Sequence, residues 1–274
     1  MSYYNIKKYD DAKREFRKVL KAYPKSFEAS ESQYYLGIIE EDDDRYYEAY
    51  KAYQRLIDKY PFSERIQEAN EREYKIAEAF MSGKKRKALG VALPVENPAI
   101  EIFTKVIENS TYGPLAPKAQ YKLGLILKGL MRYYEAEEAF NKVVTNYPES
   151  EWVEPAKFQI ASSRASLSRS SDYDMAAAEE AKKKFEDFVK EHPDAVLSED
   201  AENNIKQLRE KEAQASFNVG KFYEKQAAYE AARIYYTDTV NNYSGSVWAE
   251  KAQERLKVVE KILEKKEKAQ KKKR

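Results

Sequence analysis

The sequence predicts an all-α fold in which helical hairpins repeat along the chain and build a right-handed superhelical solenoid. The first observation behind this prediction is a recurring set of an aromatic residue, an alanine, a second aromatic residue and a proline, at steps of three, four and eight residues. The copies, the last without its proline, are Tyr9, Ala12, Phe16, Pro24; Tyr46, Ala49, Tyr53, Pro61; Tyr133, Ala136, Phe140, Pro148; and Tyr229, Ala232, Tyr236. The second observation is a glycine nine residues before three of the tyrosines, at Gly37, Gly124 and Gly220.

The spacing of these residues predicts a pair of helices in each copy. Steps of three and four place side chains on one face of a helix, and a proline eight residues later ends that helix. Glycine or alanine in the first helix and alanine in the second let the two backbones approach closely, while the aromatic rings fill the space around the crossing. Repeated helical pairs with this pattern are typical of tetratricopeptide repeats.

The repeats divide residues 1–260 into the units of a single array. We expect these units at about 1–24, 25–61, 62–114, 115–148, 149–193 and 194–244, followed by a capping helix at 247–263 and a frayed basic tail at 264–274. The first unit has little sequence before its second helix. Because the apolar face of a lone helix needs a neighbour, we expect the natural chain to begin upstream.

Three segments lengthen individual units beyond the regular spacing. The third unit contains an extra loop around residues 84–98, and the fifth contains a Ser-rich surplus at 162–174. In the last unit, residues 198–226 contain no helix breaker and are rich in Glu, Lys, Ala and Gln. This composition predicts one long helix.

The composition excludes several classes of function. Hydrophobic residues make up 42% of the 274 residues and charged residues 35%, which suits amphipathic helices that each expose a charged face. With 49 basic and 47 acidic residues, the net charge of +2 gives no reason to expect a nucleic-acid partner. The chain has no cysteine, which excludes disulfides, thiolate metal sites and cysteine nucleophiles. No apolar stretch approaches the roughly 20 residues of a membrane-spanning helix.

The sequence shows no pattern typical of an enzyme, a cofactor site or a metal site. His192 directly precedes Pro193 at a predicted helix end, where a cation suits the helix dipole, and no orienting partner is evident. The acidic run at 40–44 lacks the ligand spacing and central glycine of a calcium loop. The glycine before Lys84 lacks the spacing of a phosphate-binding loop. We therefore predict a protein that works by binding.

Two groups of residues are candidates for binding. The insertion carries a compact basic cluster, Lys84, Lys85, Arg86 and Lys87, which suits anionic lipid headgroups or an acidic partner and equally suits a solvated loop. The 23 tyrosines are the second signal, because tyrosine serves shallow cores and binding grooves alike. The residues predicted to line a peptide groove, with core packing as the alternative, are Tyr34, Tyr35, Tyr46 and Tyr53.

The last unit resembles a known family. From residue 205 it reads IKQLREKEAQASFNVGKFYEKQAAYEAARIYY, which resembles the fifth repeat of the BamD-type outer-membrane assembly lipoproteins. In that family a long helix with a leucine, basic residues and an alanine leads to an aromatic pair and a second helix that begins aromatic-x-Ala-Ala. The matching residues here are Leu208, Arg209, Lys211, Ala213, Phe222, Tyr223, Tyr229, Ala231 and Ala232. The segments YPFSERIQEANERE and FVKEHPDAVLSEDAENNI resemble joins between repeats of the same family.

The resemblance implies a non-catalytic scaffold on the periplasmic face of the outer membrane. Its implied partners are a BamA-like β-barrel insertase, bound by the C-terminal repeats, and unfolded outer-membrane protein segments, received by the N-terminal repeats. Peripheral membrane association would come from a lipid-anchored cysteine, which this sequence does not contain. The residues implied to bind the partner are Arg209, Lys211, Lys221, Tyr223 and Arg233. Ser216 departs from the family, which usually has a glutamate there.

Two other functions fit the repeat pattern. One is a periplasmic repeat protein of the Tol-Pal type that coordinates the cell envelope, which an upstream coiled-coil segment would indicate. The other is a cytosolic co-chaperone or regulatory module, which would have no export signal.

Overall fold

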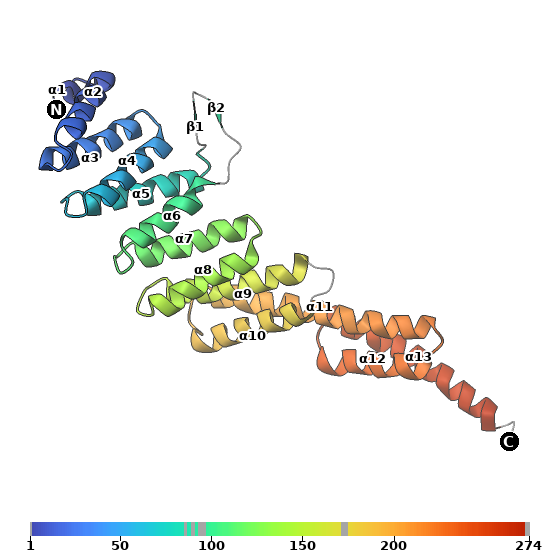
Figure 1. The fold of residues 1–274 in the computed structure, drawn as a ribbon. Helices are drawn as coiled ribbons and strands as arrows, with labels where there is room; N and C mark the ends of the chain where they lie inside the picture. The colour runs from blue at the N-terminus through green and yellow to red at the C-terminus, as the bar shows by residue number, and fades with distance from the viewer. Residues whose placement is uncertain (1, 85–86, 89–90, 93–96, 171–174, 272–274) are drawn as a thin grey trace. The chain divides into compact units, whose positions relative to one another are not determined.

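The computed structural model describes residues 2–84, 87–88, 91–92, 97–170 and 175–271. The chain folds into two compact units, residues 1–156 and 157–274. The single array predicted over residues 1–260 stays a prediction. In both units the described residues are almost entirely helical, which confirms the predicted all-α fold of tetratricopeptide-like hairpins (Figure 1).

The first unit is a stack of helices in which each helix from α1 to α7 packs on the next in chain order. Its helices are α1 (Ser2–Asn5), α2 (Tyr9–Ala22), α3 (Phe27–Asp42), α4 (Tyr46–Lys59), α5 (Ile66–Met81), α6 (Pro98–Asn109), α7 (Ala116–Gly129), α8 (Tyr133–Asn146) and the start of α9 (Val153–Ser170). The insertion between α5 and α6 holds a short antiparallel pair, β1 (Lys87–Ala88) and β2 (Val91–Ala92), with Lys87 opposite Ala92. The sequence predicted only a loop there.

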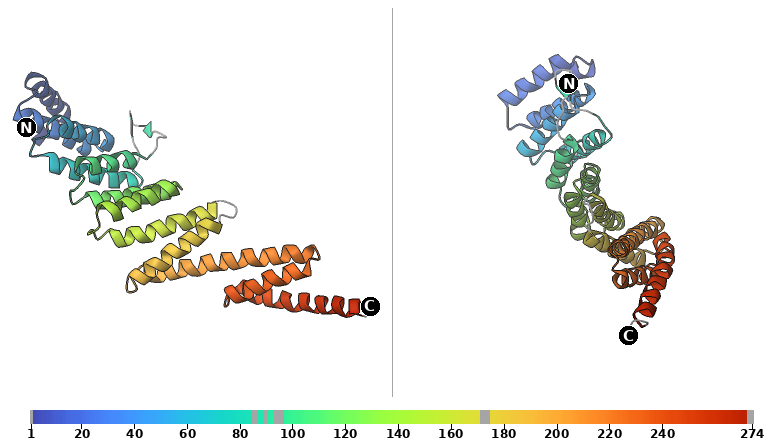
Figure 2. Two further views of the ribbon diagram at one scale, coloured as in Figure 1. Left: turned by 60° about the horizontal axis from the view of Figure 1, so that its bottom comes forward. Right: turned by 90° about the vertical axis from the view of Figure 1, so that its right-hand side faces the viewer.

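The second unit contains most of α9, then α10 (Met175–Glu191), α11 (Ser198–Lys225), α12 (Tyr229–Asn242) and α13 (Val247–Lys271). Phe158 of α9 packs edge-on against Phe185 of α10, with ring centroids 5.6 Å apart. The predicted long helix at 198–226 is confirmed by α11. Figure 2 shows α12 doubling back along α11, and α13 contacts both.

The glycine of the repeat marks a close helix crossing in both units. A Cβ placed on Gly37 would lie 2.3 Å from the Tyr53 ring, and one placed on Gly220 would lie 2.8 Å from the Tyr236 ring. Tyr53 and Tyr236 are fully buried. The glycine therefore leaves room for the aromatic ring of the facing helix, as the spacing predicted.

The turn between the two helices also repeats in four of the hairpins. Two residues before the second helix, the backbone takes the left-handed conformation at Lys7, Asp44, Met131 and Ala227, with φ between 56° and 60°. Glycine is the usual residue for such a conformation, because a side chain makes it unfavourable. Here four non-glycine residues occupy it.

The Ser-rich surplus begins as helix, and one predicted boundary differs from the structure. Residues 162–170 of the surplus predicted at 162–174 belong to α9, and residues 171–174 lie outside the described part. In this helix Ser166 donates to the carbonyl of Ser162 at 2.9 Å, so a serine side chain bonds within the turn. The capping helix predicted to end at 263 continues to Lys271 as α13. Its Glu- and Lys-rich continuation has high helix propensity.

Candidate functional site

The most distinctive polar feature of the first unit is a cluster formed by three helices. Tyr53 of α4 donates a hydrogen bond from its hydroxyl to Glu41 of α3 at 2.8 Å. Arg72 of α5 donates to the same carboxylate at 3.1 Å. Burial and the neighbouring Glu41 charge raise the pKa of Tyr53, so the phenol stays a donor.

Two further residues complete this cluster around Arg72. Its Nε atom donates to the Tyr34 hydroxyl at 3.0 Å, and its Nη2 atom donates to Glu68 at 3.4 Å. Tyr34 also donates to Glu68, and burial followed by this hydrogen bond raises the pKa of Tyr34 to about 12. All three nitrogen atoms of the Arg72 guanidinium thus donate to side chains of this cluster.

The four tyrosines predicted to line a groove differ in their exposure to solvent. Tyr34 is 3% exposed and Tyr53 is 0% exposed, so these two pack the core, which was the alternative stated for them. Tyr35 and Tyr46 are half-buried. Tyr35 stacks on Phe16 with ring centroids 5.8 Å apart.

The predicted basic loop is described only at its edges. Lys84 pairs with Asp44 at 3.2 Å, and its Nζ atom lies 3.8 Å from the centre of the Tyr46 ring. Lys85 and Arg86 lie outside the described residues, and Lys87 is described only as backbone of β1. Lys84 is therefore held against the α3–α4 turn.

The second unit repeats the three-helix cluster at the same sequence separations. Tyr236 of α12 donates to Glu224 of α11 at 2.7 Å, as Tyr53 does to Glu41, and both pairs are 12 residues apart. Arg255 of α13 donates to Glu224 through Nε at 3.1 Å and also through Nη2. Burial opposes ionisation of Glu224, but the hydrogen bonds from Arg255 and Tyr236 bring its pKa below the ordinary value.

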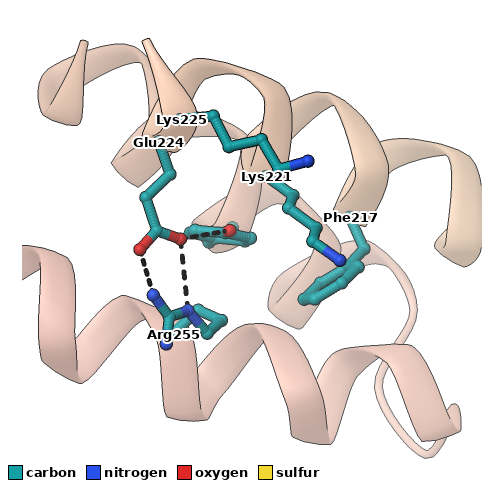
Figure 3. Close-up of a pocket in the computed structure, with 6 residues that line it drawn as sticks. Phe217, Lys221, Glu224, Lys225 and Arg255 are labelled. Atoms are coloured by element: carbon teal, nitrogen blue, oxygen red, sulfur yellow. Dashed lines mark hydrogen bonds and ion pairs between the residues drawn. The ribbon is translucent and has the colours of Figure 1, made fainter. Parts of the chain in front are cut away.

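A cavity of about 480 Å³ opens beside this second cluster (Figure 3). Its lining combines two aromatic rings with three basic side chains and one carboxylate. The lining residues are Phe217, Lys221, Glu224, Lys225, Tyr236 and Arg255. Figure 3 shows Lys221 and Lys225 projecting from α11, with the Lys221 ammonium beside Phe217 and Glu224 directed to Arg255.

The residues implied to bind a partner lie at separate places in the second unit. Arg209 donates to the carbonyl of Asn242 at 3.3 Å and lines a second cavity of about 290 Å³ at the α12–α13 turn. Lys211 is exposed on α11, and Lys221 lines the first cavity. Tyr223 stacks on Tyr235 with centroids 5.4 Å apart, and Arg233 pairs with Glu230 at 2.8 Å.

The Glu–Tyr–Arg cluster was not predicted from the sequence. The glutamate and the arginine of the cluster stand at matching positions of the two units. An alignment of the units on Gly37 and Gly220 would have revealed this match. Ser216, noted as a departure from the family, accepts from Thr239 at 2.8 Å and donates to Asp238 at 3.1 Å. It therefore joins α11 to α12.

The described residues hold neither a metal-binding cluster nor a membrane span. Among them, no group of three or more His, Asp or Glu side chains is placed to hold a metal ion. None of the helices in the described ranges is long and apolar enough to cross a membrane.

The fold and the repeated contacts define a tetratricopeptide-repeat protein. In agreement, tetratricopeptide repeat family models match residues 1–64 and 118–150. The C-terminal residues 162–274, less than half of the chain, match the family model YfiO, described as an outer membrane lipoprotein. The chain therefore combines tetratricopeptide repeats with a C-terminal segment similar to that lipoprotein family.

Solved structures with similar folds are diverse. MamA is 22% identical over 70% of this chain and 93% of its own, with a TM-score of 0.37. The C-terminal part of a TPR repeat-containing protein from Cytophaga hutchinsonii is 17% identical over 91% of this chain and 83% of its own, with a TM-score of 0.41. Pseudomonas aeruginosa pilF is 13% identical over 93% of both chains, with a TM-score of 0.31. No curated protein sequence matches the chain significantly.

Proposed function

We propose that this protein is a non-catalytic scaffold of the outer-membrane β-barrel assembly machinery, on the periplasmic face of the outer membrane. The observation that carries the proposal is the match of residues 162–274 to the outer membrane lipoprotein family model. The first unit supports it by fold, because helical repeats use extended surfaces to bind protein partners.

The proposed docking surface for a BamA-like insertase is on α11 and α12. Arg209 lines a cavity at the turn that follows α12, and Lys211 is exposed. Tyr223 and Arg233 add an aromatic ring and a charge elsewhere on the same two helices. A mixture of arginine and aromatic side chains is typical of interface hot spots.

The proposed site for barrel-precursor segments is in the first unit. Tyr35 and Tyr46 keep part of their rings accessible, whereas Tyr34 and Tyr53 support the cluster beneath. Extended polypeptide binds such surfaces through pockets for its side chains.

The test is to isolate the protein from envelopes of its native host in mild detergent and identify the co-eluting proteins. The Arg209→Glu/Lys211→Glu variant is compared with Lys183→Glu/Lys190→Glu, which changes the net charge equally on exposed positions of α10. The proposal expects an insertase with the wild type and the α10 variant, and its loss with the α11 variant. A soluble protein without an insertase would overturn the proposal and favour a Tol-Pal-type or cytosolic module.

A further inference from the structure

The cavity between α11 and α13 carries an excess of positive charge. Lys221, Lys225 and Arg255 line it, against a single carboxylate, Glu224. Glu224 is already bound by Arg255 and Tyr236, and the Lys221 charge acts on it without a hydrogen bond or ion pair. Over the described residues, no hydrogen bond or ion pair engages Lys221 or Lys225.

The first unit shows what is missing from this cavity. There Arg72 is bound on one side by Glu41 and on the other by Glu68 and Tyr34. In the second unit Arg255 has the counterpart of Glu41 in Glu224. The position that corresponds to Glu68 is Lys251, whose ammonium lies 4.0 Å from the centre of the Trp248 ring.

The other differences between the two clusters also favour an added carboxylate. Phe217 stands at the position of Tyr34 and so brings no hydroxyl to the arginine. Lys221 and Lys225 stand at the positions of Ile38 and Asp42. The second unit has therefore lost an acidic group at two of the compared positions and has gained cations beside its cavity.

We propose that this cavity binds an acidic peptide segment of a partner protein. A carboxylate of the segment occupies the place that Glu68 fills in the first unit, between Arg255 and the ammonium groups of Lys221 and Lys225. An apolar side chain next to that carboxylate packs on Phe217. Complementary charge supplies the specificity, and desolvation beside the aromatic ring strengthens the ion pairs.

This inference does not depend on the identity of the insertase, because it concerns the chemistry of one cavity on the purified full chain. The probe is a fluorescein-labelled peptide rich in Asp, Glu and Phe, and the comparison probe carries Asn and Gln in place of Asp and Glu. Fluorescence anisotropy measures both affinities. The acidic probe is expected to bind at least about tenfold more tightly than the amide probe, with an affinity that falls as salt rises.

Two matched variants locate the binding. Lys221→Glu/Lys225→Glu is expected to weaken binding of the acidic probe at least about tenfold. Lys257→Glu/Lys261→Glu makes the same charge change on exposed positions of α13 outside the cavity lining and is expected to stay within about twofold of wild type. Equal binding of the two probes, or an equal loss in both variants, would overturn the proposal.

A third variant separates binding from folding. Lys221→Met/Lys225→Met keeps apolar stems on α11 and removes both charges. It is expected to retain the wild-type circular dichroism spectrum and to weaken binding of the acidic probe about tenfold. Unchanged binding in this folded variant would show that the lysines do not hold the carboxylate, and would also overturn the proposal.

Discussion

The hydroxyl of Tyr236 donates a hydrogen bond to Glu224 at 2.7 Å, from a ring that is itself fully buried. Tyr53 and Glu41 make the same contact in the first unit at 2.8 Å. In each unit the carboxylate also binds an arginine 31 residues further along the chain. The cluster therefore joins three successive helices through one acidic group, and it is a repeated element of the fold.

The Tyr236→Phe substitution tests the value of this hydrogen bond. It removes one hydrogen-bond donor from Glu224 and keeps the aromatic ring, so the free energy of unfolding should fall by about 1 kcal/mol. Tyr235→Phe is the control, because Tyr235 contributes its ring to a stack with Tyr223. Chemical denaturation should place the control within about 0.5 kcal/mol of wild type. Equal stability of all three proteins would contradict the prediction.

The helices could be predicted from the sequence because their causes are local. The step of three and four from Tyr229 through Ala232 to Tyr236 defines one helix face, and α12 begins at Tyr229. The continuation of α13 to Lys271 was missed, since a run of like charges was expected to fray, although Glu and Lys are good helix formers.

The site was predicted less well because its contacts join distant parts of the chain. Arg255 and Glu224 are 31 residues apart, and nothing near either one in the sequence indicates the other. Tyr34 was predicted at a groove because a tyrosine pattern does not distinguish a buried ring from an accessible one. Only the comparison of equivalent positions in two units could have predicted the pairing.

The Gly124→Ala substitution tests the close helix crossing. The new Cβ would lie 2.5 Å from the ring of Phe140, which is fully buried and cannot move away freely. Overpacking of this kind costs about 1–3 kcal/mol, more than the gain of up to about 1 kcal/mol in helix propensity. The melting temperature should fall. Gly129→Ala is the control in the same helix, because its new Cβ would meet no atom within 4 Å. This variant should have an unchanged or higher melting temperature. A higher melting temperature for both variants would contradict a close crossing of α7 and α8.

The turn before α12 offers a stabilising substitution. Ala227 has φ of 58°, a conformation that costs a side-chain-bearing residue about 1–2 kcal/mol. Ala227→Gly relieves this strain and loses part of the gain to the greater freedom of the unfolded chain, so a net stabilisation of about 0.5–1 kcal/mol is expected. At the next residue, Ala228 has φ of −83°, and Ala228→Gly should destabilise. If Ala227→Gly and Ala228→Gly shift the denaturation midpoint in the same direction, backbone strain at Ala227 would be excluded.

Glu73 is fully buried in α5 at the position that Gln33 and Gln120 occupy in their repeats. Each glutamine donates to a backbone carbonyl of the next helix, Gln33 to Ala52 at 2.9 Å and Gln120 to Ala139 at 3.2 Å. Glu73 instead accepts from Asn109 at 3.1 Å through one oxygen. Burial and the charge of Asp58 raise its pKa well above 4.5.

A raised folded-state pKa means that the folded protein holds the Glu73 proton more tightly than the unfolded chain. Stability is then greatest below about pH 4.5, the ordinary value, and falls as pH rises towards the folded-state pKa, by up to about 1.4 kcal/mol per pH unit. Glu73→Gln removes this titration, so its stability relative to wild type should increase with pH in urea titrations. Glu71→Gln, at a partly exposed position of the same helix, is the control and should follow the wild-type profile. A constant difference between Glu73→Gln and wild type across pH would show that Glu73 keeps its ordinary pKa.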